Sequence, residues 1–163
     1  MGSPATDPDL IAGALITVLS PGGTPVGGIG ALVKRTPDVP YSGALPVVEV
    51  KPQQNVNTRI AASNSYQDRG WISLTYRDAP PTQSGATQSA IEDAFWTARN
   101  AIVTALRADV KLTGGSGGPA VSDAGAQIEE MFHPDGPFEV WQNAEYVVWH
   151  CRVSYIGPKQ TVP

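Results

Sequence analysis

The side chains of this sequence best suited to acid–base or metal chemistry are its two histidines and its single cysteine. His150 and Cys151 are neighbours in a run that predicts a β-strand, where successive side chains point to opposite faces of the sheet. A catalytic dyad of these two residues is therefore not expected, and we interpret Cys151 as a small buried apolar residue. His133 lies in the turn cluster 133–137, where exposure to solvent is the simple interpretation.

Carboxylates and glycine runs are the other candidates for chemistry. Paired carboxylates can divide acid and base work when a pocket separates their pKa values, but nothing in the sequence brings Asp78 together with Glu129 and Glu130. A phosphate-binding loop needs a helix N-terminus directly after it. The glycines at 114–118 follow a predicted helix, and neither this run nor the one at 27–30 ends in Gly-Lys-Ser/Thr. We therefore expect no catalytic residue, no cofactor and no metal site.

The first element that the sequence predicts is a helix over residues 8–19. Asp7 has the side chain of a helix cap, and Pro8 suits the first helical position. The segment 20–45 is rich in Gly and Pro, so we expect it to be extended, with a short strand near 29–34. The predicted apolar stripe of the helix is Leu10, Ala14, Leu15 and Val18.

Two strands follow, separated by a long polar segment. In residues 47–51, Val48 and Val50 alternate with the charged residues Glu49 and Lys51. Residues 70–78 also alternate, with Ile72, Leu74 and Tyr76 on one face and Trp71, Ser73, Thr75 and Arg77 on the other. The segment 54–69 between them is much longer than a hairpin loop, which usually has two to five residues. We interpret it as a protruding arm, with Arg59 and Arg69 as candidate interface residues.

The longest predicted helix covers residues 89–110. Ser89 followed by Glu92 has the spacing of a capping box. Apolar residues then recur every three or four positions, which is typical of a helix packed on a sheet or on a partner helix. Trp96 lies beside this stripe and is predicted to contact another subunit. The stripe consists of Ile91, Phe95, Ala98, Ile102 and Leu106.

The last third of the chain predicts a flexible loop over 113–127 and then three strands. Two of them are short, at 128–132 and 138–142. The final strand, 145–156, is apolar at most positions, which indicates a central strand or one covered on both faces. Its predicted faces are Val147, Trp149, Cys151, Val153 and Tyr155 on one side, and Tyr146, Val148, His150, Arg152 and Ser154 on the other.

The composition fits one domain and argues against two classes of function. The net charge of −4 and the lack of a basic run oppose a free-standing nucleic-acid binder, which needs clustered Lys and Arg. The apolar stretch 10–19 is shorter than the roughly 20 residues that cross a bilayer. Charged residues make up 16% of the chain, against about 25% in a typical domain. Either neighbouring subunits cover part of the surface, or Ser, Thr, Asn and Gln make it polar.

Together these patterns predict an α+β fold. We expect a mostly antiparallel sheet of about four to five strands packed against two helices, at 8–19 and 89–110. Residues 7–156 are predicted to form one domain, with loose tails at 1–6 and 157–163. Trp71, Trp96, Trp141 and Trp149 lie in strongly patterned elements, where a core or subunit-interface role is expected.

The order of these elements resembles the tail terminator, or tail-completion, proteins of long-tailed, siphovirus-like bacteriophages. The residues that carry the resemblance are the run Ser89-Ala90-Ile91-Glu92-Asp93-Ala94-Phe95, which opens the long helix, and the final strand ending Val153-Ser154-Tyr155-Ile156. The similarity covers about 7–156. The chain departs from the family pattern at the long Gly/Pro-rich segment 20–45 and at the 113–127 loop, which looks inserted.

This resemblance implies a structural virion protein without enzymatic activity. It implies a homo-oligomeric ring, typically hexameric, which caps the tail tube, ends its polymerisation and joins it to neck or connector proteins. Double-stranded DNA would pass through the ring without being read, and the protein would be assembled in the host cytoplasm. No membrane contact is implied. Two alternatives stay open: a head-closure or connector protein of the same neck, and a small α/β ligand-binding or enzyme domain.

Overall fold

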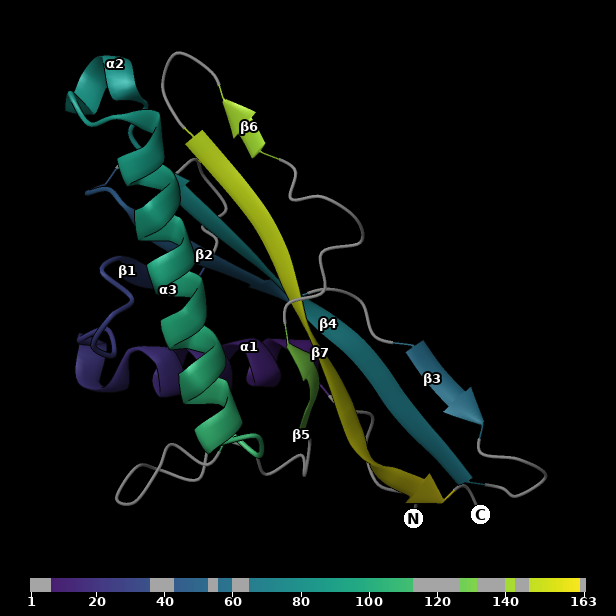
Figure 1. The fold of residues 1–163 in the computed structure, drawn as a ribbon. Helices are drawn as coiled ribbons and strands as arrows, with labels where there is room; N and C mark the ends of the chain where they lie inside the picture. The colour runs from purple at the N-terminus through teal and green to yellow at the C-terminus, as the bar shows by residue number, and fades with distance from the viewer. Residues whose placement is uncertain are drawn as a thin grey trace.

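A computed structural model of the protein describes residues 7–35, 43–52, 56–59, 65–112, 127–131, 140–142 and 147–161. These residues form an α+β fold around one seven-stranded sheet, which confirms the predicted fold class. The sheet has the order β1-β2-β4-β7-β5, with β3 paired to β4 and β6 paired to β7 (Figure 1). The β1–β2 pair is parallel, and the other pairs are antiparallel. The strands are β1 Leu32–Arg35, β2 Val47–Pro52, β3 Val56–Arg59, β4 Ser65–Asp78, β5 Gln127–Met131, β6 Val140–Gln142 and β7 Val147–Thr161.

The long strands β4 and β7 form the centre of the sheet, and for β7 its mostly apolar sequence predicts this position. In β4 the predicted inner residues Ile72, Leu74 and Tyr76 are buried. In β7 the buried inner residues include Trp149 and Val153, each directly opposite a residue of that β4 row. Side chains of one parity therefore line one face and build the core.

Strand β7 extends past the predicted end of the domain. Residues 157–163 were expected as a tail, but β7 runs to Thr161, and Gln67 donates from its side chain to the Gly157 carbonyl at 3.0 Å. The prediction missed this extension because Pro158 cannot donate to a strand ladder. The pairing is irregular at that point, stepping from Gln67↔Lys159 to Arg69↔Ile156, so a bulge accommodates the proline.

The predicted arm 54–69 contains more regular structure than its polar composition indicates. Its last residues, 65–69, belong to β4, and β3 pairs antiparallel with them, Val56 opposite Arg69. This hairpin lies beyond the ends of the helices in Figure 1. The predicted strand 70–78 therefore begins five residues too late, because β4 continues its pairing with β7 through the polar segment.

The first helix, α1, covers Pro8–Leu19 as predicted, and an Asp7 carboxylate oxygen accepts the Asp9 amide at 2.9 Å. The predicted stripe was wrong at Leu10, which is 56% exposed. The helix instead turns the row Ile11, Leu15 and Leu19 into the core, at a spacing of four residues. A short 3₁₀ turn, η1 (Pro21–Gly23), ends the helix where glycine and proline predict it.

The long helix, α3, covers Gln88–Ala108 and buries the whole predicted stripe. Its cap is Thr87, whose hydroxyl accepts the Ala90 amide at 3.1 Å, so the predicted capping box at Ser89 and Glu92 was wrong. Both Ser and Thr are good caps, and here α3 begins at Gln88, so Thr87 takes the role. A short helix, α2 (Pro81–Ser84), lies between β4 and α3.

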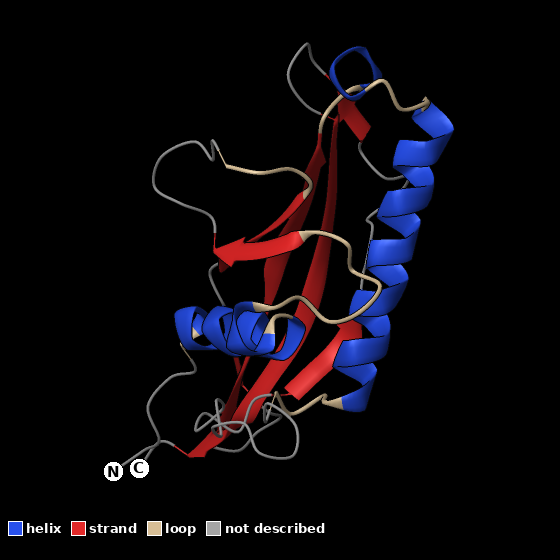
Figure 2. Ribbon diagram, turned by 90° about the vertical axis from the view of Figure 1, so that its left-hand side faces the viewer, coloured by secondary structure: helices blue, strands red, loops and turns tan. Residues whose placement is uncertain are grey.

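Both long helices cover the same face of the sheet and share one apolar core (Figure 2). Phe95 of α3 stacks on Trp149 with ring centroids 5.0 Å apart and meets Tyr76 edge-on at 5.5 Å. The helix α1 packs against β1, β2 and β4 and also touches α3. In the part of the chain that the structure describes, the fold therefore has two layers, with both long helices on one face of the sheet.

Some predictions fall outside the described residues. These are the tail at 1–6, most of the loop at 113–127 and the turn with His133. Within the described residues, no helix is long and apolar enough to cross a membrane.

Candidate functional site

The candidates for chemistry do not come together. His150 lies on the outer face of the sheet, with its Nδ1 atom 3.2 Å from the Thr75 hydroxyl. Asp78 pairs with Val147 and Glu130 with Ser154, so the backbones of these two residues are roughly 23 Å apart along β7 at about 3.3 Å per residue. Among the residues that the structure describes, no group of three His, Cys, Asp or Glu could hold a metal ion.

The glycine run at 27–30 leads into β1 and not into a helix, so it lacks the geometry of a phosphate loop. Gly28 has φ +94°, and a Cβ placed on it would lie 3.2 Å from the Ala101 Cβ of α3. Glycine is needed here for a backbone turn and for close approach to the helix. The role of this residue is structural.

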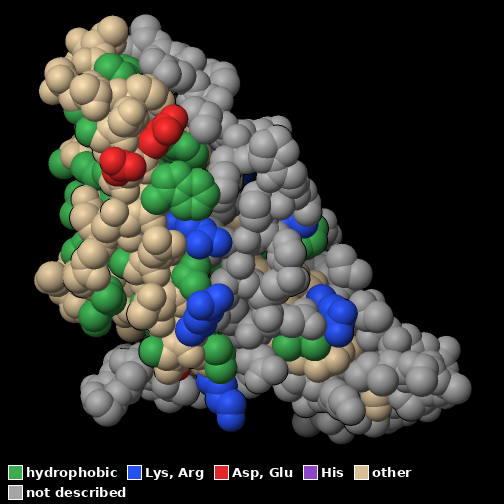
Figure 3. All heavy atoms as spheres, in the orientation of Figure 1, with side chains coloured by type: hydrophobic (Ala, Val, Ile, Leu, Met, Phe, Trp, Pro, Cys, Tyr) green, Lys and Arg blue, Asp and Glu red, His purple; other side chains and the backbone are tan. Residues whose placement is uncertain are grey.

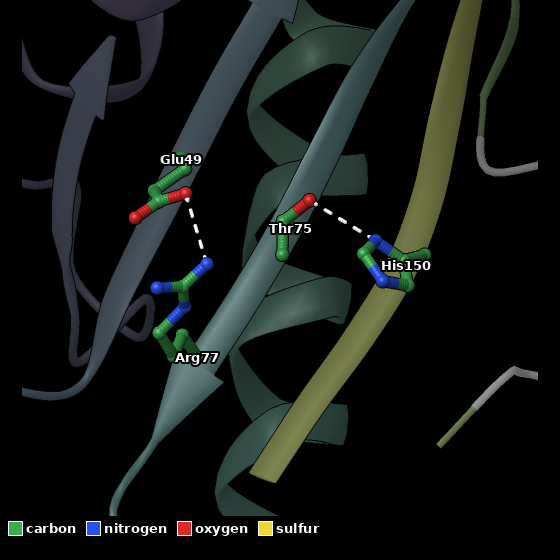
Figure 4. A network of polar contacts seen from close by, with 4 residues as sticks. All are labelled: Glu49, Thr75, Arg77 and His150. Atoms are coloured by element: carbon green, nitrogen blue, oxygen red, sulfur yellow. Dashed lines mark hydrogen bonds and ion pairs between the residues drawn. The ribbon is translucent and has the colours of Figure 1, made fainter. Parts of the chain in front are cut away.

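The outer face of the sheet carries a polar row across its central strands (Figure 4). Arg77 of β4 donates to Glu49 of β2 at 3.4 Å, while Thr75 reaches His150 of β7. The helix α3 lies behind the strands, on the opposite face. Glu49 is only 5% exposed, and one of its carboxylate oxygens has no hydrogen-bond partner among the described residues. The alternation in β2 predicts its polar face, but nothing in the sequence signals this burial.

Trp71 extends the same outer face toward the β3 hairpin. It is 36% exposed, and the Arg152 guanidinium carbon lies 5.4 Å from the centroid of a Trp71 ring. At this distance the positive charge of Arg152 is attracted to the face of the indole ring, which is a cation–π contact. Trp71 is therefore held on the outer face by Arg152 while part of its ring stays exposed.

Near one end of β4, burial changes the proton affinity of two neighbouring groups. Burial raises the pKa of the Tyr76 hydroxyl, and the nearby Asp78 carboxylate raises it further. Burial also raises the pKa of Asp78, although hydrogen bonds from the Ala79 amide and Tyr76 oppose this shift. The Tyr76 hydroxyl donates to the Asp78 carboxylate, so the two groups form one hydrogen-bonded pair near this strand end.

The predicted interface residues are spread over two regions. Trp96 is 41% exposed on α3, in edge contact with Phe95 at 5.4 Å and 5.8 Å from the Arg99 guanidinium carbon. Arg59 and Arg69 lie in the β3–β4 hairpin, and Arg69 is exposed. Figure 3 shows acidic side chains beside the upper part of α3 and basic ones beside its lower part. Trp96 on α3 and the two arginines in the hairpin therefore lie in separate parts of the subunit and do not form one site.

Comparisons with known proteins find a structure of similar fold, and they indicate no function. No protein-family model and no curated protein matches the chain. Among solved structures, a protein with 16% sequence identity matches with a TM-score of 0.50 over 98% of this chain and 99% of its own length. Its name describes no function. At this identity the similarity shows the shared α+β fold alone.

Proposed function

We propose that this protein is a structural subunit of the head–tail junction of a long-tailed bacteriophage. In this role it forms a ring that caps the tail tube, ends tube polymerisation and connects the tube to the neck. The observation that supports the proposal is the order of elements: a capped helix, a strand pair, a long helix and a final long strand that returns to the middle of the sheet. This is the order on which the resemblance to tail terminator proteins rests.

The distribution of polar groups is consistent with an assembly role. Among the described residues, acidic and basic groups form pairs such as Glu49 with Arg77 and Asp9 with Arg35, and no group of three His, Cys, Asp or Glu could hold a metal ion. Exposed aromatic residues, Trp71 and Trp96, lie next to arginines, and this combination is enriched at protein interfaces. A net charge of −4 suits a channel through which DNA passes without being held.

Native mass spectrometry and negative-stain imaging of the purified protein test the proposal. We expect six-fold rings, and we expect capped tube ends when tail-tube protein is added. A stable monomer that carries a bound small molecule would contradict the proposal. The neck alternative is separated by the partner: a head-closure protein binds DNA-filled heads, whereas a terminator binds tubes.

A further inference from the structure

The sheet ends in two open edges that face away from each other. Strand β1 is at one end of the strand order and β5 is at the other, and among the described residues each pairs with a strand on one side only. An open strand edge presents backbone N–H and C=O groups that can pair with another chain. Each edge is therefore able to extend the sheet.

A hollow of about 400 Å³ lies beside β1. Its walls are the second half of α1, the η1 turn and the four residues of β1, with Ile16, Leu32 and Val33 supplying apolar surface and Lys34 and Arg35 supplying charge. Arg35 also forms an ion pair with Asp9 at the start of α1, so helix and strand edge are joined around this space. The hollow leaves room for side chains of a strand that pairs with β1.

The sequences of the two edge strands contain residues of opposite charge. Strand β1 ends in Lys34 and Arg35, which are exposed. The sequence of β5 contains two adjacent acids, Glu129 and Glu130. Opposite charges in cross-strand positions stabilise strand pairing, and like charges oppose it. Pairing β1 with a second β1, or β5 with a second β5, would bring like charges together, so the unlike edges are the complementary ones.

The strand directions permit this unlike pairing in a closed ring. Strands β1 and β2 run one way, β4 runs the other way, β7 reverses again, and β5 runs opposite to β1. A rotation about an axis parallel to the strands keeps these directions, so β5 of one subunit meets β1 of the next in antiparallel order. Such a head-to-tail contact closes into a ring when the rotation angle allows it.

We propose that β5 of one subunit pairs antiparallel with the β1 edge of a second copy, with Glu129 and Glu130 facing Lys34 and Arg35. The sheet then continues from subunit to subunit. This inference deepens the proposed function and rests on it for closure of the ring, while the edge pairing itself is tested separately.

Sedimentation velocity over a range of protein concentrations tests the pairing with the full chain. We expect Lys34→Glu and Glu130→Lys each to weaken self-association about tenfold, because one attractive cross-strand pair becomes repulsive. Lys51→Glu and Glu92→Lys are the matched controls, since they make the same charge changes at exposed positions away from both edges. They are expected to associate like the wild type. Circular dichroism confirms that each variant is folded.

Mixing the two edge variants gives the sharpest result. Where the natural β5 of the Lys34→Glu variant meets the natural β1 of the Glu130→Lys variant, the charges are those of the wild type. Where the two altered edges meet, the charges are exchanged but still opposite. An equimolar mixture is therefore expected to recover wild-type association, although neither variant associates well alone. Edge variants that associate like the wild type, a mixture that does not recover, or a wild-type protein that stays monomeric at every concentration would overturn the edge pairing.

The outcomes separate this inference from the proposed function. Rings that form equally well in both edge variants would overturn the edge pairing and leave the ring function standing. If the mixture of the two variants recovers association but forms open chains and no closed rings, the edge pairing is supported and the ring function is contradicted.

Discussion

The two faces of the sheet differ in what covers them. The inner face lies under α1 and α3, and its side chains form one apolar core with stacked and edge-on aromatic contacts. The outer face carries Glu49, Thr75, Arg77 and His150 in polar pairs, with Trp71 partly exposed beside them (Figure 4). The inner face determines the fold, because apolar burial dominates folding free energy. On the outer face Val47, Glu49 and Val148 are buried as well, so we expect substitutions to be tolerated best at its exposed positions.

The largest expected difference between the faces comes from removing one aromatic ring on each. Phe95→Ala is expected to lower the free energy of unfolding by about 3–5 kcal/mol, because it leaves a cavity between Tyr76 and Trp149. The matched change on the outer face, Trp71→Ala, is expected to cost about 1 kcal/mol or less, since the ring is already partly exposed. Urea unfolding measures both. Equal costs would show that the outer face is also covered.

The buried carboxylate on the outer face is expected to be its most sensitive polar group. Glu49→Ala removes a partner of Arg77 and should cost about 2 kcal/mol, less than a fully buried pair because Arg77 keeps some exposure. Lys51→Ala, at an exposed position on the same strand, serves as the control with an effect within about 0.5 kcal/mol. Chemical unfolding of the two variants gives the comparison. If Glu49→Ala has no more effect than Lys51→Ala, the pair contributes nothing to stability.

On the inner face, the Tyr155 hydroxyl is buried and has no hydrogen-bond partner among the described residues. Tyr155→Phe is therefore expected to stabilise the protein at neutral pH, by about 1 kcal/mol. Burial, with added repulsion from Asp68 and Asp7, raises the pKa of Tyr155 from 10.0 to about 12.

The gain in stability from Tyr155→Phe is expected to increase with pH. Because the pKa of Tyr155 is higher in the folded than in the unfolded state, the wild type keeps its full stability below pH 10 and loses stability as the pH rises toward 12. The advantage of Tyr155→Phe over the wild type should therefore grow between pH 10 and 12. Unfolding experiments at pH 8 and near pH 11 measure it. An advantage that is constant over this range would contradict the raised pKa.

The smallest expected effect is at the exposed end of the outer polar row. Thr75→Val keeps the branched shape that strands favour and removes the hydroxyl that lies near His150. We expect a change of less than about 0.5 kcal/mol in the free energy of unfolding, because the contact is exposed to water. Thermal unfolding at neutral pH measures the change. A loss above about 1 kcal/mol would assign the outer row a larger structural role.

The sequence predicts most of the inner face, because burial there follows simple periodicities. The period of two in β4 and the three-and-four spacing in α3 identify the buried residues correctly, from Ile72 to Leu106. Sequence reasoning is weaker where several residues can play the same part. Thr87 and Ser89 are both good helix caps, and only the tertiary structure selects Thr87. Leu10 is apolar, yet the rotation of α1 leaves it exposed.

The outer face and the edges are less predictable, because they depend on contacts between distant segments. The extension of β7 past Pro158 requires a bulge opposite Asp68, which local patterns do not indicate. The burial of Glu49 depends on neighbouring strands and cannot be read from β2 alone. The candidate interface residues Arg59, Arg69 and Trp96 stay predictions, since only a partner could bring them into one surface.

The pairing of β4 with β7 has a consequence for how the chain is made. Thr75 meets His150 across a separation of 75 residues, and Gln67 meets Gly157 across 90. Until β7 leaves the ribosome, β4 has no neighbour on that side, and the apolar faces of α1 and α3 lack part of the sheet on which they pack. Such long-range closure is slow compared with local helix formation. The fold is therefore expected to be completed only after β7 has been synthesised, and a product truncated before β7 should be a substrate for chaperones or proteases.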